Sequence, residues 1–173
     1  MNLIITSSRH LESEAAEEMS EILEEFGDPN APVEISALSG ILTATTSLDP
    51  FLVVKKIREK ILDEPWLIRY CLRIIPLHDA VNTKKDDIVK SVHNHISVMQ
   101  PQDTYRITVE KRHSEISTNE IIREIADKIQ NKVSLEKFDW IVLIEILGKR
   151  TGIAIIKEND ILSTHKVKRS LSE

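Results

Sequence analysis

Apolar residues in the first 76 positions recur with the two spacings that distinguish strands from helices. The predicted strands cover residues 3–6, 33–38, 41–46 and 67–75, and the predicted helices cover residues 11–26 and 49–61. Gly27 with Pro29 is expected to end the first helix, and Asp49 followed by Pro50 is a typical start for the second. The order strand, helix, strand, strand, helix, strand is that of a ferredoxin-like domain, which we assign to residues 1–76.

The second half of the chain contains a strand, helix, strand unit. Residues 105–110 alternate between apolar and polar, whereas residues 140–147 are almost all apolar, as expected of a parallel strand covered on both faces. Between these strands, Ser117 and Glu120 have the spacing of a capping box, which predicts the start of an amphipathic helix. A short strand at residues 153–156 completes the unit.

The segments on either side of this unit are less regular. Residues 77–82 read as a connector, and a helix is predicted from Thr83 to Met99. Thr83 and Asp86 have capping-box spacing at its start. The tail from Ser163 onward has few apolar residues, so we expect it to be frayed.

The composition excludes several classes of protein. With 173 residues, 41% hydrophobic and 29% charged, the chain is expected to be soluble and to form one large or two small domains. Its longest apolar run is far below the roughly 20 residues that span a bilayer, so neither a membrane anchor nor a signal peptide is expected. Cys71 is the only cysteine, which excludes an intrachain disulfide and a Cys-plus-His zinc site. These features predict a cytoplasmic location.

Catalytic motifs are not evident. None of the glycines belongs to a phosphate-binding or dinucleotide-binding loop, so we expect no cofactor and no catalytic domain. His93 and His95 lie two positions apart on a predicted helix and point about 200° apart, which argues against a shared metal ion. Cys71 is interpreted as a small buried hydrophobe.

The charge is unevenly distributed along the chain. The net charge is −5, but residues 1–80 contain 7 Lys and Arg against 14 Asp and Glu, while residues 81–173 contain 16 against 14. A polyanion would therefore be met mainly by the second half. The glutamates of the 11–26 helix form either a solvated face or a surface for a basic partner.

Basic residues gather where the strands of the second half end. Cations in such loops reach phosphates without being buried, and the arginine fork suits phosphate oxygens. The helix start at Ser117 adds unpaired N–H groups and a positive dipole end. The alternative is that these charges only solvate the strand ends. The candidate RNA-binding residues are Arg106, Lys111, Arg112, His113, Ser117, Lys149 and Arg150.

The order of elements in the second half resembles a THUMP domain. The likeness rests on residues 105–112, the capped helix from Ser117, residues 138–145 and residues 152–156, about half of the chain. The chain departs from the usual pattern at Phe138, where a proline is common, and at Ala154, where a serine is expected. We assign residues 83–165 to this domain. The expected fold is therefore α/β (α+β), a ferredoxin-like domain followed by a THUMP domain with a βαβ core.

The resemblance implies a function. THUMP domains are RNA-binding modules of tRNA-modifying systems, and a ferredoxin-like domain usually precedes them. The chain is most similar to stand-alone THUMP proteins that help an RNA cytidine acetyltransferase act on the D arm of serine and leucine tRNAs. This implies a noncatalytic adaptor that grasps the acceptor end of tRNA and has that acetyltransferase as its partner. Two alternatives remain: a ferredoxin-like regulatory module that binds a small ligand or self-associates through sheet edges, and a tRNA-modifying enzyme.

The basic residues are expected to differ in importance. Charge reversal at Lys149 and Arg150 should weaken tRNA binding at least about tenfold without disturbing the fold, because both lie at a predicted exposed strand end. Changes at Lys84 and Lys85 should matter less, since both lie outside the strongest likeness.

Overall fold

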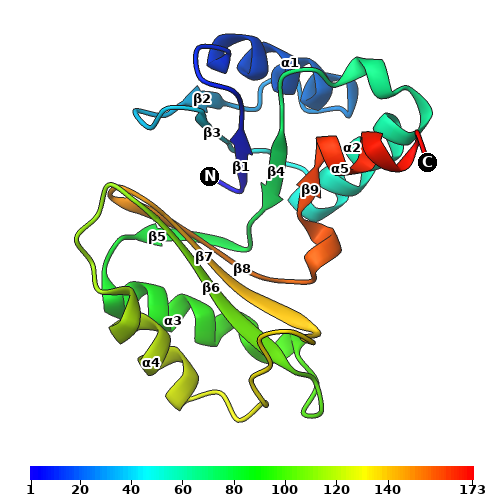
Figure 1. Cartoon of the computed structure of the whole chain (residues 1–173). Coiled ribbons are helices and arrows are strands. Elements are labelled where there is room, and N and C mark those ends of the chain that lie inside the picture. Colours follow the sequence, from blue (N-terminus) through cyan, green and yellow to red (C-terminus); the bar gives the residue numbers. More distant parts are fainter. The chain divides into compact units, whose positions relative to one another are not determined.

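The chain divides into two compact units, each with its own sheet (Figure 1). The computed structural model describes residues 1–173. The first unit comprises Met1–Leu77 and Asn159–Glu173, and the second comprises His78–Glu158. The predicted domain ranges, 1–76 and 83–165, differ from these units mainly at the C-terminal end, where the chain returns to the first unit. Every helix is too short or too polar to cross a membrane.

The first unit is built on the predicted βαββαβ order. Its elements are β1 (Leu3–Thr6), α1 (Glu12–Glu25), β2 (Val33–Ile35), β3 (Ile41–Ala44), α2 (Pro50–Asp63) and β4 (Arg73–Pro76), followed at the end of the chain by β9 (Leu162–Ser163) and α5 (Thr164–Ser170). The sheet is antiparallel, in the order β2-β3-β1-β4-β9. The first four strands have the ferredoxin-like arrangement, which confirms the predicted fold class. As predicted, Asp49 caps α2, accepting hydrogen bonds from the N–H groups of Phe51 and Leu52.

The predicted strand at residues 67–75 begins only at Arg73. The segment before it is held by a carboxylate instead of a sheet partner, because Glu18 of α1 accepts hydrogen bonds from three successive N–H groups, those of Arg69, Tyr70 and Cys71. Cys71 therefore lies off the strand, but it is buried, and burial raises the pKa of its thiol.

The prediction of a frayed tail is wrong. Leu162 pairs with Ile74 of β4, and the hydroxyl of Thr164 donates to the carbonyl of Cys71 at 2.9 Å. Val167 of the tail and Leu162 just before it are buried, whereas Leu171 near the C-terminus is exposed. The two buried side chains are enough to fix the segment because the backbone of β9 also extends the first sheet.

A buried carboxylate joins two loops of the first unit and makes a pH-dependent contribution that can be measured. Asp28 accepts hydrogen bonds from the Thr46 hydroxyl at 2.6 Å and the Ser47 N–H at 2.7 Å, which hold its pKa below the ordinary value. Its contribution to stability is present above the unfolded pKa of 3.8 and is lost as pH falls through the folded value. We expect Asp28→Asn to lower the free energy of unfolding at pH 7 and to differ much less from wild type near pH 3. Urea titrations at both pH values test this, and a pH-independent difference would contradict it.

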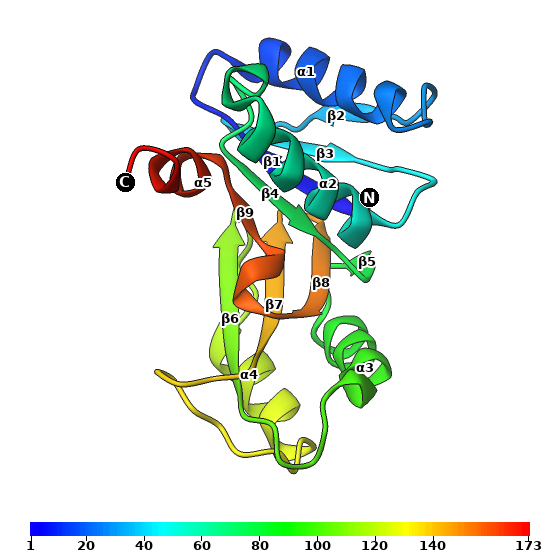
Figure 2. The ribbon, with the colours of Figure 1, turned by 90° about the vertical axis from the view of Figure 1, so that its right-hand side faces the viewer.

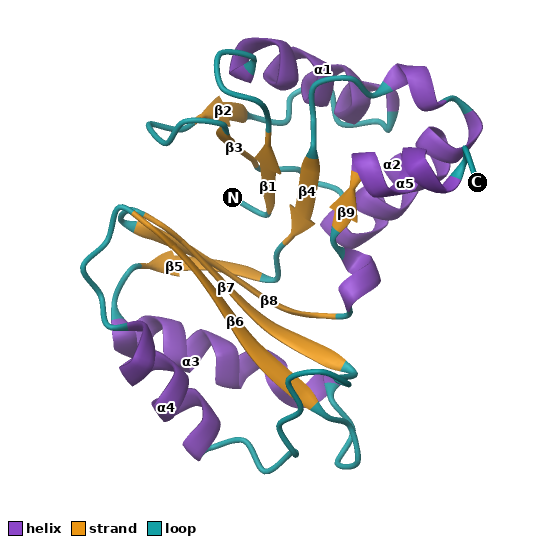
Figure 3. Ribbon diagram, viewed as in Figure 1, coloured by secondary structure: helices purple, strands orange, loops and turns teal.

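The second unit is a four-stranded sheet with two helices on one face (Figure 3). Its elements are β5 (Asp79–Asn82), α3 (Lys85–His95), β6 (Tyr105–Arg112), α4 (Thr118–Asp127), β7 (Trp140–Leu147) and β8 (Arg150–Ile156). The strand order is β5-β8-β7-β6, with β6 and β7 parallel and the other pairs antiparallel. The predicted βαβ core is therefore present.

Two predictions before β6 are wrong. Residues 77–82 are not a plain connector, because they contain β5, which pairs with β8. Thr83 does not cap the next helix, which begins at Lys85 without a side-chain cap. The Thr83 hydroxyl instead lies 2.8 Å from the Thr151 hydroxyl of β8. The Thr83 side chain, which the local spacing had predicted as a helix cap, thus interacts with a distant strand instead.

Several loops lie together at the rim of this sheet, which is the edge where its strands begin or end. Because β6 and β7 are parallel and Arg112 lies beside Leu147, both strands end at the same edge. β8 begins there and β5 ends there, since Asn82 pairs with Arg150. The starts of α3 and α4 follow directly from these strand ends. Ligands of open α/β sheets commonly bind at this kind of edge.

Candidate nucleic-acid interface

Three loops at this edge form a pocket of about 430 Å³. They are the turns from β5 to α3, from β6 to α4 and from β7 to β8. We call the cavity the rim pocket. Its lining residues are Asn82, Thr83, Lys84, His113, Ser114, Gly148 and Lys149.

Backbone hydrogen bonds fix the three loops to one another. The N–H of Gly148 donates to the carbonyl of Arg112 at 2.9 Å, and the N–H of Thr83 donates to the carbonyl of Lys149 at 2.9 Å. Gly148 and His113 both have positive φ angles, 63° and 53°, so each turns the chain sharply at the end of a strand. The pocket is therefore lined by loops that are held in place before any ligand arrives.

The rim pocket carries cations that are available to a ligand. Lys84, His113 and Lys149 are exposed, and neither lysine side chain forms an ion pair or hydrogen bond. Ser117 caps α4 by accepting from the N–H of Glu120 at 3.4 Å, so its hydroxyl is engaged, but the first turn of the helix still adds a positive dipole end. Free cations on a preformed pocket suit a phosphate.

Three of the predicted site residues are used to hold the scaffold. Arg112 forms an ion pair with Glu145 at 3.1 Å, and the Glu145 side chain is 1% exposed. The guanidinium of Arg150 donates to Asn82 and Ala80, which ties β8 to β5, and the ammonium of Lys111 donates to the carbonyl of Ile116. These cations are less available to a ligand than those of the rim pocket.

Arg106 lies far from the other candidates. It is the second residue of β6, beside Ile141, and lies six strand positions before Arg112, a distance of about 20 Å. Its guanidinium donates to the carbonyl of Leu135 at 3.3 Å and lies over the Phe138 ring at 5.3 Å. The structure therefore brings His113, Lys149 and the Ser117 helix start together at one edge and leaves Arg106 at the opposite end.

Lys84 lines the rim pocket, a position that the sequence did not predict. Without β5, residues 83 and 84 have no predicted place beside the turn from β7 to β8, so nothing in the local pattern links Lys84 to Lys149. Its neighbour Lys85 differs in environment, because its ammonium forms an ion pair with Glu124 at 3.1 Å, which raises the pKa of Lys85. The charge of Lys85 is therefore already paired within the protein.

The pair Lys84 and Lys85 provides a matched comparison. We expect Lys84→Ala to weaken binding of an RNA ligand and to reduce the slope of log affinity against log salt by about one, as for loss of one phosphate contact. Lys85→Ala should leave that slope unchanged, because its ammonium is held by Glu124. Fluorescence anisotropy over a salt series measures both slopes. Equal effects of the two substitutions would contradict the assignment of Lys84 to the pocket.

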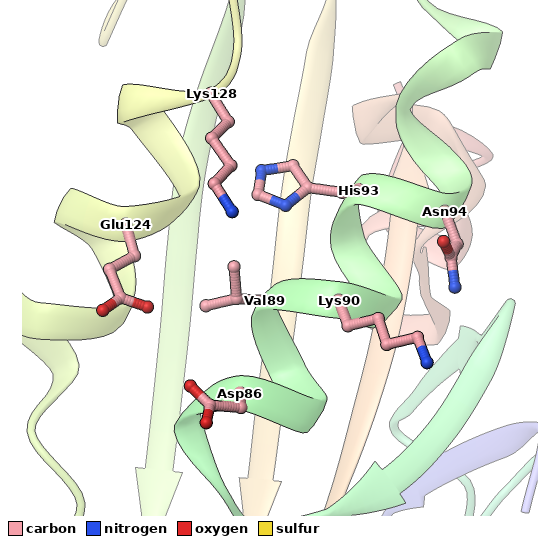
Figure 4. A pocket seen from close by; sticks show the side chains of 7 residues that line it. All are labelled: Asp86, Val89, Lys90, His93, Asn94, Glu124 and Lys128. Atoms are coloured by element: carbon pink, nitrogen blue, oxygen red, sulfur yellow. The ribbon is translucent and has the colours of Figure 1, made fainter.

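A second pocket, of about 380 Å³, lies between α3 and α4 (Figure 4). The carboxylates of Asp86 and Glu124 share it with Lys90, Lys128 and His93. This mixture of signs suits a polyanion less well than the rim pocket does.

The two histidines of α3 have separate surroundings. The Nε2 atom of His93 lies 3.4 Å from the carbonyl of Ile125, whereas His95 bonds the carbonyl of Ser91 through Nδ1 and stacks on His78. No group of three or more His, Cys, Asp or Glu side chains is arranged to hold a metal ion.

Residues 82–156 match the THUMP domain family. The matched segment is somewhat less than half of the chain and contains all the residues that line the rim pocket. A comparison with curated protein sequences gave no match.

Solved structures share the fold over nearly the whole chain. PH1313 from Pyrococcus horikoshii Ot3 has a TM-score of 0.68 at 16% identity, over 91% of this chain and 55% of that one. TrmN from Thermus thermophilus has a TM-score of 0.58 at 12% identity, over 90% and 45%. A 4-thiouridine synthetase in complex with RNA and ATP has a TM-score of 0.56 at 10% identity, over 94% and 42%. The chain thus spans about half the length of these structures or less, and at such identities the likeness establishes the fold.

Proposed function

We propose, from the THUMP domain formed by residues 82–156, that this protein is a noncatalytic tRNA-binding protein that presents tRNA to a separate RNA cytidine acetyltransferase. THUMP domains are RNA-binding modules, so RNA is the ligand class that the domain itself indicates. The single observation that best supports the proposal is the rim pocket, where Lys84 and Lys149 stand exposed and unpaired around a preformed cavity.

The pocket suits a nucleotide at the end of a strand more than a duplex. Its volume of about 430 Å³ lies in the range of pockets that enclose small ligands. The two lysines and the N-terminus of α4 can each face a phosphate, while the loop backbones line the cavity. Protein recognition of RNA commonly targets single-stranded ends, where bases are accessible. The 3′ end of tRNA is therefore the proposed occupant.

An adaptor can raise the rate of a reaction without a reactive group of its own. Holding a substrate in the right position relative to a second enzyme removes part of the entropic barrier. In this proposal the tRNAs are those for serine and leucine, and the modified site is in the D arm. The acetyltransferase catalyses the reaction, and this protein binds and positions the tRNA.

Binding of purified protein to full-length serine tRNA, and to the same tRNA without its 3′ CCA end, tests the RNA part of the proposal. With about four phosphate contacts, log affinity should fall against log salt with a slope near −3, and removal of CCA should weaken binding further. Binding that ignores salt would instead favour the alternative, a regulatory module for a small neutral ligand. Failure to bind either tRNA would contradict the proposal for the protein alone.

Reconstitution with the RNA cytidine acetyltransferase of the same organism tests the adaptor part. Acetylation of serine tRNA should rise when this protein is added, and this protein with acetyl-CoA alone should give none. Acetylation or another modification by the isolated protein would show that it is an enzyme. No stimulation, with tRNA binding intact, would direct the search to a different modifying partner.

A further inference from the structure

The β6 strand forms an unusually long open edge for this protein. It is the outermost strand of its sheet and contains eight residues, whereas the other edge strands, β2, β5 and β9, contain three, four and two (Figure 2). Long edges present unpaired N–H and C=O groups that can pair with another strand. Short edges limit such pairing, and β6 lacks this protection.

The direction of the backbone groups on β6 can be read from its first residue. The N–H of Tyr105 donates to the carbonyl of Lys132, and the carbonyl of Tyr105 accepts from the N–H of Ser134, both on the side away from β7. Groups alternate in direction along a strand, so Ile107, Val109 and Lys111 also direct their N–H and C=O groups outward. β6 has no other strand partner than β7, so these outward groups are open to solvent.

We propose that β6 pairs antiparallel with β6 of a second copy of this chain, in a register centred on Val109. In this register Val109 faces Val109 and Ile107 faces Lys111, so the three outward residues of each copy form about six hydrogen bonds. The arrangement is self-complementary, as a twofold interface requires. Residues 132–134 cover the edge beside Tyr105. In this register Tyr105 would face His113 of the second copy, and the positive φ of His113 turns that chain away from the edge there.

The side chains agree with this register. Ile107 and Val109 pack only partly against the core on the α4 side, so a neighbouring strand would cover them further. On the other side, Arg106 would face Arg112 of the second copy. In the second copy, Arg112 is paired with Glu145 of the same copy. Glu110 of the second copy would also lie diagonally opposite Arg106 of the first. The two arginines are thus accompanied by two carboxylates.

The pairing changes the position of Arg106 relative to the rim. Within one chain Arg106 is about 20 Å from Arg112, but across the pair it would lie directly opposite it. Each copy would then contribute Arg106 to the basic strand ends beside the rim pocket of the other. This last step rests on the proposed RNA-binding function, whereas the strand pairing itself does not.

Disulfide crosslinking in the absence of RNA tests the register. Facing residues of this kind have Cα atoms about 5.5 Å apart, within disulfide range, so Val109→Cys should crosslink under mild oxidation. Ile107→Cys is the matched control on the same face, because its two copies would be separated by four residues, about 13 Å. We expect dimer to form at least about tenfold faster with V109C than with I107C. Wild type, whose Cys71 is buried, should not crosslink. Equal rates, or no V109C dimer, would overturn the pairing.

A mutant cycle on tRNA affinity tests the contribution of Arg106. Val109→Lys should abolish pairing by bringing two ammonium groups together. Thermal melting and sedimentation check that this variant is folded and monomeric. We expect Arg106→Ala to weaken tRNA binding at least about threefold in wild type and not at all in V109K. An equal loss in both backgrounds would overturn the contribution across the pair. If wild type binds no tRNA while V109C still crosslinks, the proposed function fails and the pairing stands.

Discussion

Reversal of both free cations of the rim pocket, Lys84→Glu with Lys149→Glu, is expected to weaken tRNA binding about 100-fold at physiological salt. Each substitution removes an attraction to phosphate and adds a repulsion, and neither lysine has a partner within the protein that would be disturbed. Both side chains are exposed, so the melting temperature should change little. Anisotropy titration with serine tRNA measures the effect.

The matched control reverses two exposed lysines of the first unit, Lys55→Glu with Lys166→Glu. It changes the net charge of the chain by the same amount but leaves the THUMP domain untouched. A small loss of affinity in the control reports long-range electrostatics alone, which salt screens. Comparable losses in the two double variants would mean that overall charge, and not the rim pocket, determines binding.

Removal of the Arg112 guanidinium should cost stability more than RNA affinity. Arg112→Met removes an ion-pair partner of the nearly inaccessible Glu145, and breaking a buried pair from one side typically costs about 3–5 kcal/mol. Since Arg112 is about one-third exposed, we expect the lower end, about 3 kcal/mol, in urea unfolding. Folded R112M should bind tRNA nearly as well as wild type.

Neutralising the Glu145 carboxylate tests whether its buried charge causes the loss of stability in R112M. Glu145→Gln in the R112M background should recover part of the lost stability, because no charge then remains buried at that position. A lack of recovery would show that the carboxylate is not the source of the loss. An R112M variant of normal stability with weak tRNA binding would instead make Arg112 a direct phosphate contact, as the sequence pattern had indicated.

The sequence predicted the main elements because their signals are local. Apolar spacing located helices α1 to α4 and the two long parallel strands, and the side chain of Ser117 caps α4 as its spacing indicated. β5 was missed because it has only four residues, with Ala80 and Val81 as its apolar members, and is defined by pairing with β8 some 70 positions later. β9 was missed for the same reason, since two residues carry no periodicity.

The candidate site was only partly predictable because a cation's availability depends on its neighbours. The basic residues near the ends of β6 and β7 were located at the rim of the sheet by position alone. Whether a given cation is free depends on contacts between distant segments, such as Arg112 with Glu145 and Arg150 with Asn82. Lys84 shows the reverse case, because its inclusion in the pocket follows from a strand that the local pattern did not reveal.

The return of the C-terminal segment to the first unit makes the segment from His78 to Glu158 an insertion within a ferredoxin-like fold. The insertion leaves just after β4 and re-enters through a 3-10 turn at Glu158–Asp160 just before β9, and β9 pairs with β4. A fragment ending at residue 158 would lack β9 and α5 and expose the edge of β4. Excising the insertion and joining Leu77 to Asn159 through a glycine-rich link would instead preserve the first unit's strand order, and would yield a ferredoxin-like module without the THUMP segment.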